Sequence, residues 1–155
     1  MKKIYSVSLT ILFVFAASFS LTAQNLFFSN ASETAISQLQ GKRMIIPEKY
    51  RTLAANTNQL RAFLWSLPSD KNIISNQTPI MELPMPDGTM ARFHVWESSV
   101  MEPGLEAKFP EMKTFAGYGI DDPYASIRLD YNPYFGFHAQ ILSIRGNIYQ
   151  LLYCR

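Results

Sequence analysis

The chain has 155 residues, 48% of them hydrophobic, and carries 14 lysines and arginines against 12 acidic residues. This length and apolar content suit one domain with a core of its own. The basic residues form no stripe of the kind that nucleic-acid binding requires, so we expect no nucleic-acid partner. Cys154 is the single cysteine, which excludes an intrachain disulfide, and we interpret it as an incidental thiol close to the chain end.

Residues 1–23 predict a cleavable secretory signal peptide. Lys2 and Lys3 form a short cationic start, and a long uncharged stretch follows them. Its densest apolar run is Ile11–Ala17. An uncleaved anchor helix would need about 20 predominantly apolar residues, so we favour a leader that is removed.

Small residues place the predicted cut between Ala23 and Gln24. We therefore expect the mature chain to be secreted or periplasmic, with no membrane contact after cleavage. Loss of Lys2 and Lys3 leaves 12 basic residues against 12 acidic ones, so the mature chain is formally neutral. The basic character of the full chain thus belongs to a segment that we expect to be discarded.

The first part of the mature chain, residues 24–78, predicts helical and irregular structure. Asn30 and Glu33 have the spacing of a capping box, which would open a short helical segment ending at Gly41. The polar stretch from Ser69 to Thr78 predicts a connecting loop.

A second helix in this part has the clearer amphipathic pattern. It begins at Asn56, with Gln59 in the reciprocal capping position, and Pro68 ends it. Its apolar side chains follow the i, i+3, i+4, i+7 spacing, at Leu60, Phe63, Leu64 and Leu67. A stripe of this width predicts a helix that docks on a sheet.

The second part, residues 79–155, predicts an antiparallel β meander. Turn residues separate short apolar or alternating runs, and in the first turn, Met85–Gly88, the glycine supplies the positive φ that reverses the chain. The runs that we predict as strands are Ile80–Pro84, Met90–Glu97, Lys113–Tyr118, Ala125–Tyr131, Phe135–Ser143 and Asn147–Tyr153. Glu102–Phe109 predicts one or two helical turns between the second and third strands. The other connections are too short for parallel crossovers. We therefore predict a single-domain α+β fold, mainly an antiparallel meander with one or two packed helices.

The chain offers no convincing catalytic set. It lacks an H-E-x-x-H pair and a G-x-S-x-G elbow, and its two histidines, His94 and His138, have no obvious third ligand beside them. In the strand Met90–Glu97, Arg92, His94 and Trp96 share the face opposite Phe93 and Val95. We therefore expect no catalytic, cofactor or metal residue here. A cleft that unites a histidine with acidic residues would instead favour a third possibility, namely that the chain is a small enzyme.

Two further features leave alternatives open. Asp121 and Asp122 could present a metal or partner contact on a loop, although Asp side chains before Pro123 more often cap a turn. The aromatic residues could form an exposed face for a glycan or a matrix protein, or fill the core. The tyrosines concerned are Tyr118, Tyr124, Tyr131, Tyr134 and Tyr149.

Several stretches stand out together by their order and spacing: Glu82–Gly88, Glu97–Met101, Leu105–Phe115, Gly117–Pro123 and Gly136–Ala139, with a weaker one at Pro47–Arg51. In this order they resemble the N-terminal pro-region of secreted bacterial reprolysin-like zinc metalloproteases. The resemblance extends from about Arg43 to Tyr149. After Tyr149 the chain departs from the Ile-Asp-Pro type sequence usual in the family, so we expect a truncated precursor, a frame-shifted copy or a stand-alone pro-domain.

The resemblance implies a pro-domain that assists folding of a protease and keeps it latent. Its partner would be the catalytic domain of that metalloprotease, where the zinc ion would lie. This chain would have no enzyme activity of its own. In some related proteases a pro-region cysteine or aspartate blocks the zinc ion. Cys154 lacks a cysteine-switch context, which leaves Asp121 or Asp122 as the candidate blocking residue.

Overall fold

The computed structural model describes residues 27–32, 50–72, 78–144 and 148–152, and the side chains among them up to residue 144. The predicted leader, the Ala23–Gln24 cut and Cys154 lie outside the described residues. So does most of the helical segment predicted to run from Asn30 to Gly41.

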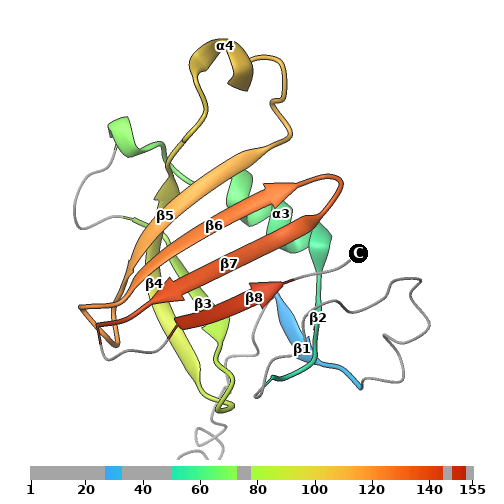
Figure 1. Cartoon of the computed structure of the whole chain (residues 1–155), viewed down its shortest axis with the longest axis vertical. Helices are drawn as coiled ribbons and strands as arrows, with labels where there is room; N and C mark the ends of the chain where they lie inside the picture. Colours follow the sequence, from blue (N-terminus) through green and yellow to red (C-terminus); the bar gives the residue numbers. More distant parts are fainter. Residues whose placement is uncertain (1–26, 33–49, 73–77, 145–147, 153–155) are drawn as a thin grey trace, which may run out of the picture.

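A six-stranded antiparallel meander forms most of the fold, as predicted (Figure 1). Its strands pair in chain order: β3 (Ile80–Pro84), β4 (Met90–Glu97), β5 (Lys113–Gly119), β6 (Ser126–Asn132), β7 (Gly136–Leu142) and β8 (Ile148–Leu152). The predicted limits of β3 and β4 are correct, and those of the other four differ by one residue at one or both ends. The α+β class is thereby confirmed.

The N-terminal part contains a strand pair that the sequence did not indicate. β1 (Phe28–Asn30) pairs antiparallel with β2 (Leu53–Ala55). Strands of three residues are too short for alternation to be recognised above chance. A 3₁₀ turn, η1 (Asp70–Asn72), lies inside the predicted loop.

The predicted amphipathic helix is α3 (Thr57–Trp65). The side chain of Asn56 caps it by accepting a hydrogen bond of 3.2 Å from the backbone N–H of Gln59, as the spacing predicted. The reciprocal bond expected from Gln59 is not formed, because the backbone N–H of Asn56 donates to the carbonyl of Phe27 at 2.8 Å. Leu60 and Leu64 are fully buried, so this face of the helix is part of the core. The helix ends before Pro68, with Ser66 as its C-cap residue.

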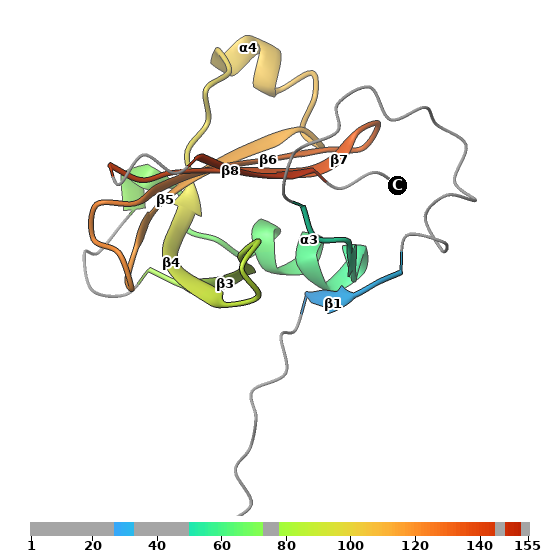
Figure 2. The ribbon, with the colours of Figure 1, turned by 60° about the horizontal axis from the view of Figure 1, so that its bottom comes forward.

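The sheet curls so that β3 and β4 lie on the same side as α3 and β1 (Figure 2). The enclosed face carries the core residues Met81, Leu83, Phe93, Val95, Phe115, Ile127, Leu129, Phe137, Ala139 and Ile141. Gly117 belongs to the same face of β5, between Val95 and Ile127 in the register. Since it has no Cβ, the backbone of β4 can approach β5 closely there.

The opposite face of the sheet, called here the outer face, is not covered by α3 (Figures 1 and 2). The connection between β4 and β5, residues 98–112, rises from the end of this sheet and contains α4 (Pro103–Glu106). We call these residues the arm. None of the residues of α4 is buried. In the part of the chain that the structure describes, no helix has the length and apolar character to cross a membrane.

Candidate functional site

The outer face gathers polar and aromatic side chains from four consecutive strands. Strand register sets their order, because residues opposite one another on neighbouring strands share a cross-strand row. One row contains Trp96, Ala116, Arg128 and Gln140, and the next contains Thr114, Asp130 and His138. His94, Tyr118 and Ser126 form the row on the other side.

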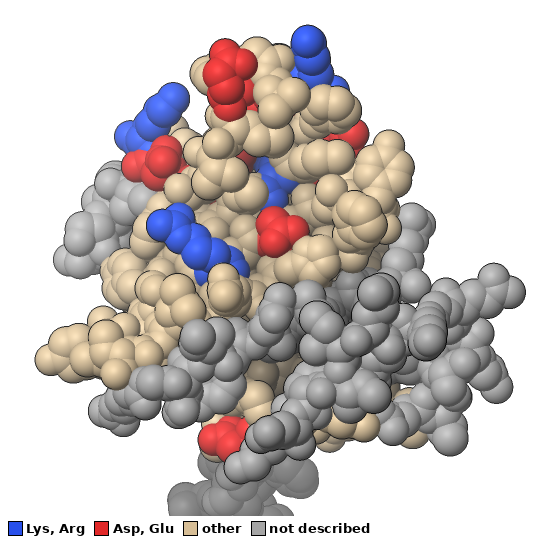
Figure 3. All heavy atoms as spheres, viewed as in Figure 1, with Lys and Arg blue, Asp and Glu red and all other residues tan. Residues whose placement is uncertain are grey.

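A hollow of about 490 Å³ lies on this face beside the start of the arm. Its lining includes Val100, Thr114, Arg128, Asp130, His138 and Gln140. Figure 3 looks onto the same face and shows mainly uncharged side chains, with basic and acidic side chains close together over its middle. This face therefore carries neither a predominantly positive nor a predominantly negative charge.

Asp130 and His138 form the most defined polar contact in the hollow. The Nδ1 atom of His138 donates a hydrogen bond of 2.8 Å to Oδ2 of Asp130. This contact fixes the imidazole ring and leaves its Nε2 atom for a ligand. The hollow thus brings His138 together with an acidic neighbour, which is the arrangement that would favour the alternative of a small enzyme.

Ser98 also lines the hollow, but among the described residues no hydrogen bond joins its hydroxyl to His138. Its backbone N–H donates to Thr114, so its backbone lies three strand spacings, about 14 Å, from that of His138. The hydroxyl of Thr114 donates to the carbonyl of Ser98 at 2.6 Å. Neither Ser98 nor Thr114 is therefore placed as a nucleophile for the Asp130–His138 pair.

His94 lies in an aromatic cluster at the other side of the outer face. Its ring centroid is 5.1 Å from that of Tyr118, and the ring of Tyr118 is 5.8 Å from that of Trp96. The Nδ1 atom of His94 is 3.0 Å from the hydroxyl of Thr78, so this histidine has a neighbour as its partner. Since β4 and β7 are separated by two strands, His94 and His138 do not meet. Among the described residues, no three His, Cys, Asp or Glu side chains are placed to hold a metal ion.

Asp121 takes part in the turn between β5 and β6. Its side chain accepts hydrogen bonds from the backbone N–H of Arg92 at 2.8 Å and from the guanidinium of Arg92 at 2.7 Å. The hydrogen bonds from Arg92 hold the pKa of Asp121 below its ordinary value, and Asp121 in turn raises the pKa of Arg92. This carboxylate thus ties the β5–β6 turn to β4.

Asp122 lies in the same turn and also has partners within the chain. Its Oδ1 atom accepts a hydrogen bond from the backbone N–H of Tyr124 at 3.1 Å, the geometry of an Asx turn. Its Oδ2 atom accepts one from the hydroxyl of Ser143 at 2.8 Å. These bonds match the turn interpretation of the Asp121–Asp122 pair, while zinc blocking stays a prediction.

The tyrosines that the sequence singled out do not form one row. Tyr118 is on the outer face, whereas Tyr131 packs against Trp65 at the core, with ring centroids 5.3 Å apart. Tyr124 and Tyr134 are exposed at hairpin turns, and the side chain of Tyr149 is not described.

The sequence reasoning missed Trp96, Arg128, Asp130 and Gln140 as members of a site. Side chains along β6 and β7 alternate between core and solvent, and this alternation puts Arg128, Asp130 and Gln140 on the polar faces. The face assignment that was made for β4 would, if extended to these strands, have placed the three residues together on one side of the sheet.

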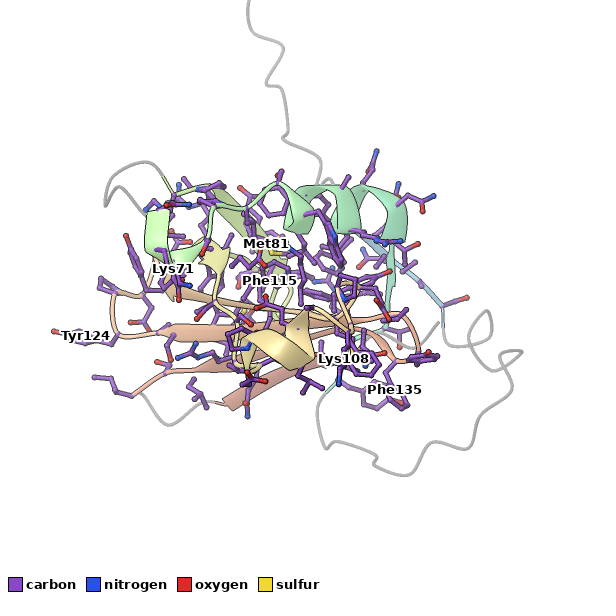
Figure 4. The ribbon with its side chains drawn as sticks, turned by 90° about the horizontal axis from the view of Figure 1, so that it is seen from above. Lys71, Met81, Lys108, Phe115, Tyr124 and Phe135 are labelled. Carbon is purple, nitrogen blue, oxygen red and sulfur yellow. The ribbon has the colours of Figure 1, made fainter. Side chains whose placement is uncertain are left out.

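Exposed apolar side chains lie at both ends of the sheet, and five of them are at the end from which the arm rises, whereas Tyr124, Leu142 and Ile144 are at the other end. In the arm, Val100 is 75% exposed, Leu105 45% and Phe109 40%. Tyr134 and Phe135, in the turn between β6 and β7, are exposed at the same end. Figure 4 shows Phe135 and Tyr124 at opposite ends of the strands, with Lys108 of the arm toward Phe135. We call Val100, Leu105, Phe109, Tyr134 and Phe135 the apolar end.

Comparison of this chain with protein-family models, with curated proteins and with solved structures gives no match.

Proposed function

We propose that this chain is the pro-domain, or a truncated precursor, of a secreted zinc metalloprotease, and that it assists folding of the protease domain and keeps it latent. The proposal begins from the resemblance of its motifs to the pro-regions of reprolysin-like proteases. It includes export by the predicted leader, with a working site outside the cytoplasm.

One observation carries the proposal beyond the resemblance. The motifs Glu97–Met101 and Leu105–Phe115 span most of the arm, and they contain Val100, Leu105 and Phe109. Phe115 at the end of the second motif belongs to the core, but Val100, Leu105 and Phe109 are exposed and contribute nothing to it. Contiguous exposed apolar surface is typical of contact with another protein. We infer that the apolar end is covered by the protease domain.

The action that we propose requires no reacting group in this chain. A domain that covers a cleft acts through shape and surface burial. Such burial releases water from apolar side chains and thereby stabilises the complex. The zinc ion would belong to the protease domain, and Asp121 or Asp122 would approach it only by giving up the bonds described above.

The test is titration of the purified chain against the mature metalloprotease domain of the same organism, with peptide hydrolysis as the readout. We expect inhibition that saturates at one chain per protease. The double variant Leu105→Asp and Phe109→Asp should weaken inhibition at least about tenfold, because it puts charges into the buried contact. Tyr124→Asp, at the opposite end of the sheet, is the matched control and should inhibit like the wild type.

A second comparison addresses the aspartates. If Asp121→Asn and Asp122→Asn inhibit as well as the wild type, zinc blocking by these carboxylates is wrong while inhibition by surface contact stands. If the wild-type chain neither inhibits the protease nor speeds its refolding, the proposed function itself is wrong.

A further inference from the structure

We propose that the outer face binds a neutral saccharide, with one sugar unit stacked against Tyr118 and neighbouring units hydrogen-bonded in the hollow lined by Arg128, Gln140 and the Asp130–His138 pair. This site does not rest on the proposed function, although Val100 of the apolar end also lines the hollow.

The aromatic part of the site is the cluster of Tyr118, Trp96 and His94. Tyr118 is 41% exposed, and contacts with Trp96 and His94 at its sides restrict its ring. A fixed aromatic ring that combines an apolar face with a polar tip suits the C–H face of a sugar.

The polar part of the site contains both donors and acceptors. Within the described chain, Arg128 and Gln140 make no side-chain hydrogen bond, although Arg128 offers five donors and Gln140 both donors and an acceptor. The carboxylate of Asp130 receives one bond from His138 and retains further acceptor capacity. A hydroxyl group both donates and accepts, so a polyol matches this mixture better than a pure donor or a pure acceptor does.

The charge of the lining favours a neutral sugar over an acidic one. Arg128 and Asp130 carry opposite charges in the same hollow, and His138 is bound to the carboxylate. A carboxylated sugar would be attracted by Arg128 but would meet Asp130 on the same strand face two residues away. The hollow of about 490 Å³ is within the size range of small-ligand pockets.

The experiment uses Trp96 as a local reporter, because the chain has two tryptophans and the other, Trp65, packs against Tyr131 at the core. In the variant Trp65→Phe, emission comes from Trp96 alone. Pentamers of β-1,4-linked glucose, α-1,4-linked glucose and β-1,4-linked xylose are titrated to about 10 mM, with pentagalacturonate as the acidic comparison.

We expect at least one neutral pentamer to shift Trp96 emission in a saturable way. Tyr118→Ala should weaken binding about tenfold by calorimetry, and Arg128→Gln, at an exposed position, should weaken it without changing the melting temperature. Tyr124→Ala, which removes an exposed tyrosine outside the site, should bind like the parent.

Three results would overturn the proposal. One is that no neutral pentamer binds. Another is that binding persists unchanged in both Tyr118→Ala and Arg128→Gln, which would put the ligand elsewhere. The third is that pentagalacturonate binds as tightly as the best neutral pentamer, which would assign the site to anions. None of them bears on protease inhibition, so the two proposals fail independently.

Discussion

Gly117 is the position where a single added methyl group should damage the fold most. A Cβ at this residue would overlap the carbonyl oxygen of His94 and would stand 2.8 Å from Cγ2 of Ile127 and 3.0 Å from Cγ1 of Val95. Ordinary contacts begin at 3.4 Å. Because the first of these atoms is backbone, β4 as a whole would have to move away from β5.

Overpacking of this kind destabilises a protein by about 1–3 kcal/mol, and occasionally more. We expect Gly117→Ala to reach the upper end, about 3 kcal/mol, since no rotation of a side chain relieves the overlap with His94. For a chain of this size 1 kcal/mol corresponds to a shift of about 4 °C, so the melting temperature should fall by about 12 °C. Thermal unfolding followed by far-UV circular dichroism measures this shift.

The control is Gly104→Ala in α4. There a Cβ would meet only the carboxylate of Glu102, at 3.1 and 3.4 Å, and this flexible side chain can move aside. The control should melt within about 2 °C of the wild type. If Gly117→Ala also melts within that range, the close approach of β4 and β5 is wrong, and with it our account of how the sheet curls.

Three further predictions concern the helix and the β5–β6 turn. Leu64→Ala should lower the free energy of urea unfolding by about 2–5 kcal/mol, because Leu64 is fully buried in the core; a loss below about 1 kcal/mol would contradict its placement. Asn56→Ala should lower it by about 1 kcal/mol by removing the helix cap, and Asn56→Asp should retain most of the stability. Asp121→Asn should destabilise the chain at neutral pH. Since Arg92 holds the pKa of Asp121 below its ordinary value of 3.8, the stabilisation is present above pH 3.8 and disappears as the pH falls through the lower folded-state pKa. Melting curves of wild type and Asp121→Asn should therefore converge in acid, and a constant difference between them at every pH would refute the ion pair.

The elements that the sequence predicted well are those specified by neighbours along the chain. The cap at Asn56 and the stripe of leucines define α3, and the Met85–Gly88 turn defines the hairpin of β3 and β4. In that turn Gly88 has a φ of 94°, the left-handed conformation expected of a glycine at this point. The arm was also anticipated, as helical turns between two strands. The absence of buried residues in α4 was not anticipated, because exposure depends on which parts of the protein lie beside the arm in space.

The candidate site was predicted only in part. His94, His138 and Tyr118 were each considered, but singly and without their partners. The contact between His138 and Asp130, and the row that joins Trp96 to Arg128, depend on which residues face one another across the sheet. That register is decided when α3 and the enclosed faces of all the strands pack into one core.

By itself, the amino-acid sequence determined the meander, the main helix and the turn chemistry, because these follow from side-chain periodicity and local backbone preference. Only the tertiary structure decided that β4 and β5 approach closely at Gly117, that Asp121 is bound to Arg92 and that Arg128, Asp130, His138 and Gln140 share the outer face with Tyr118. The physical reason is that alternation assigns each residue to a face, whereas curvature and register decide which residues become neighbours.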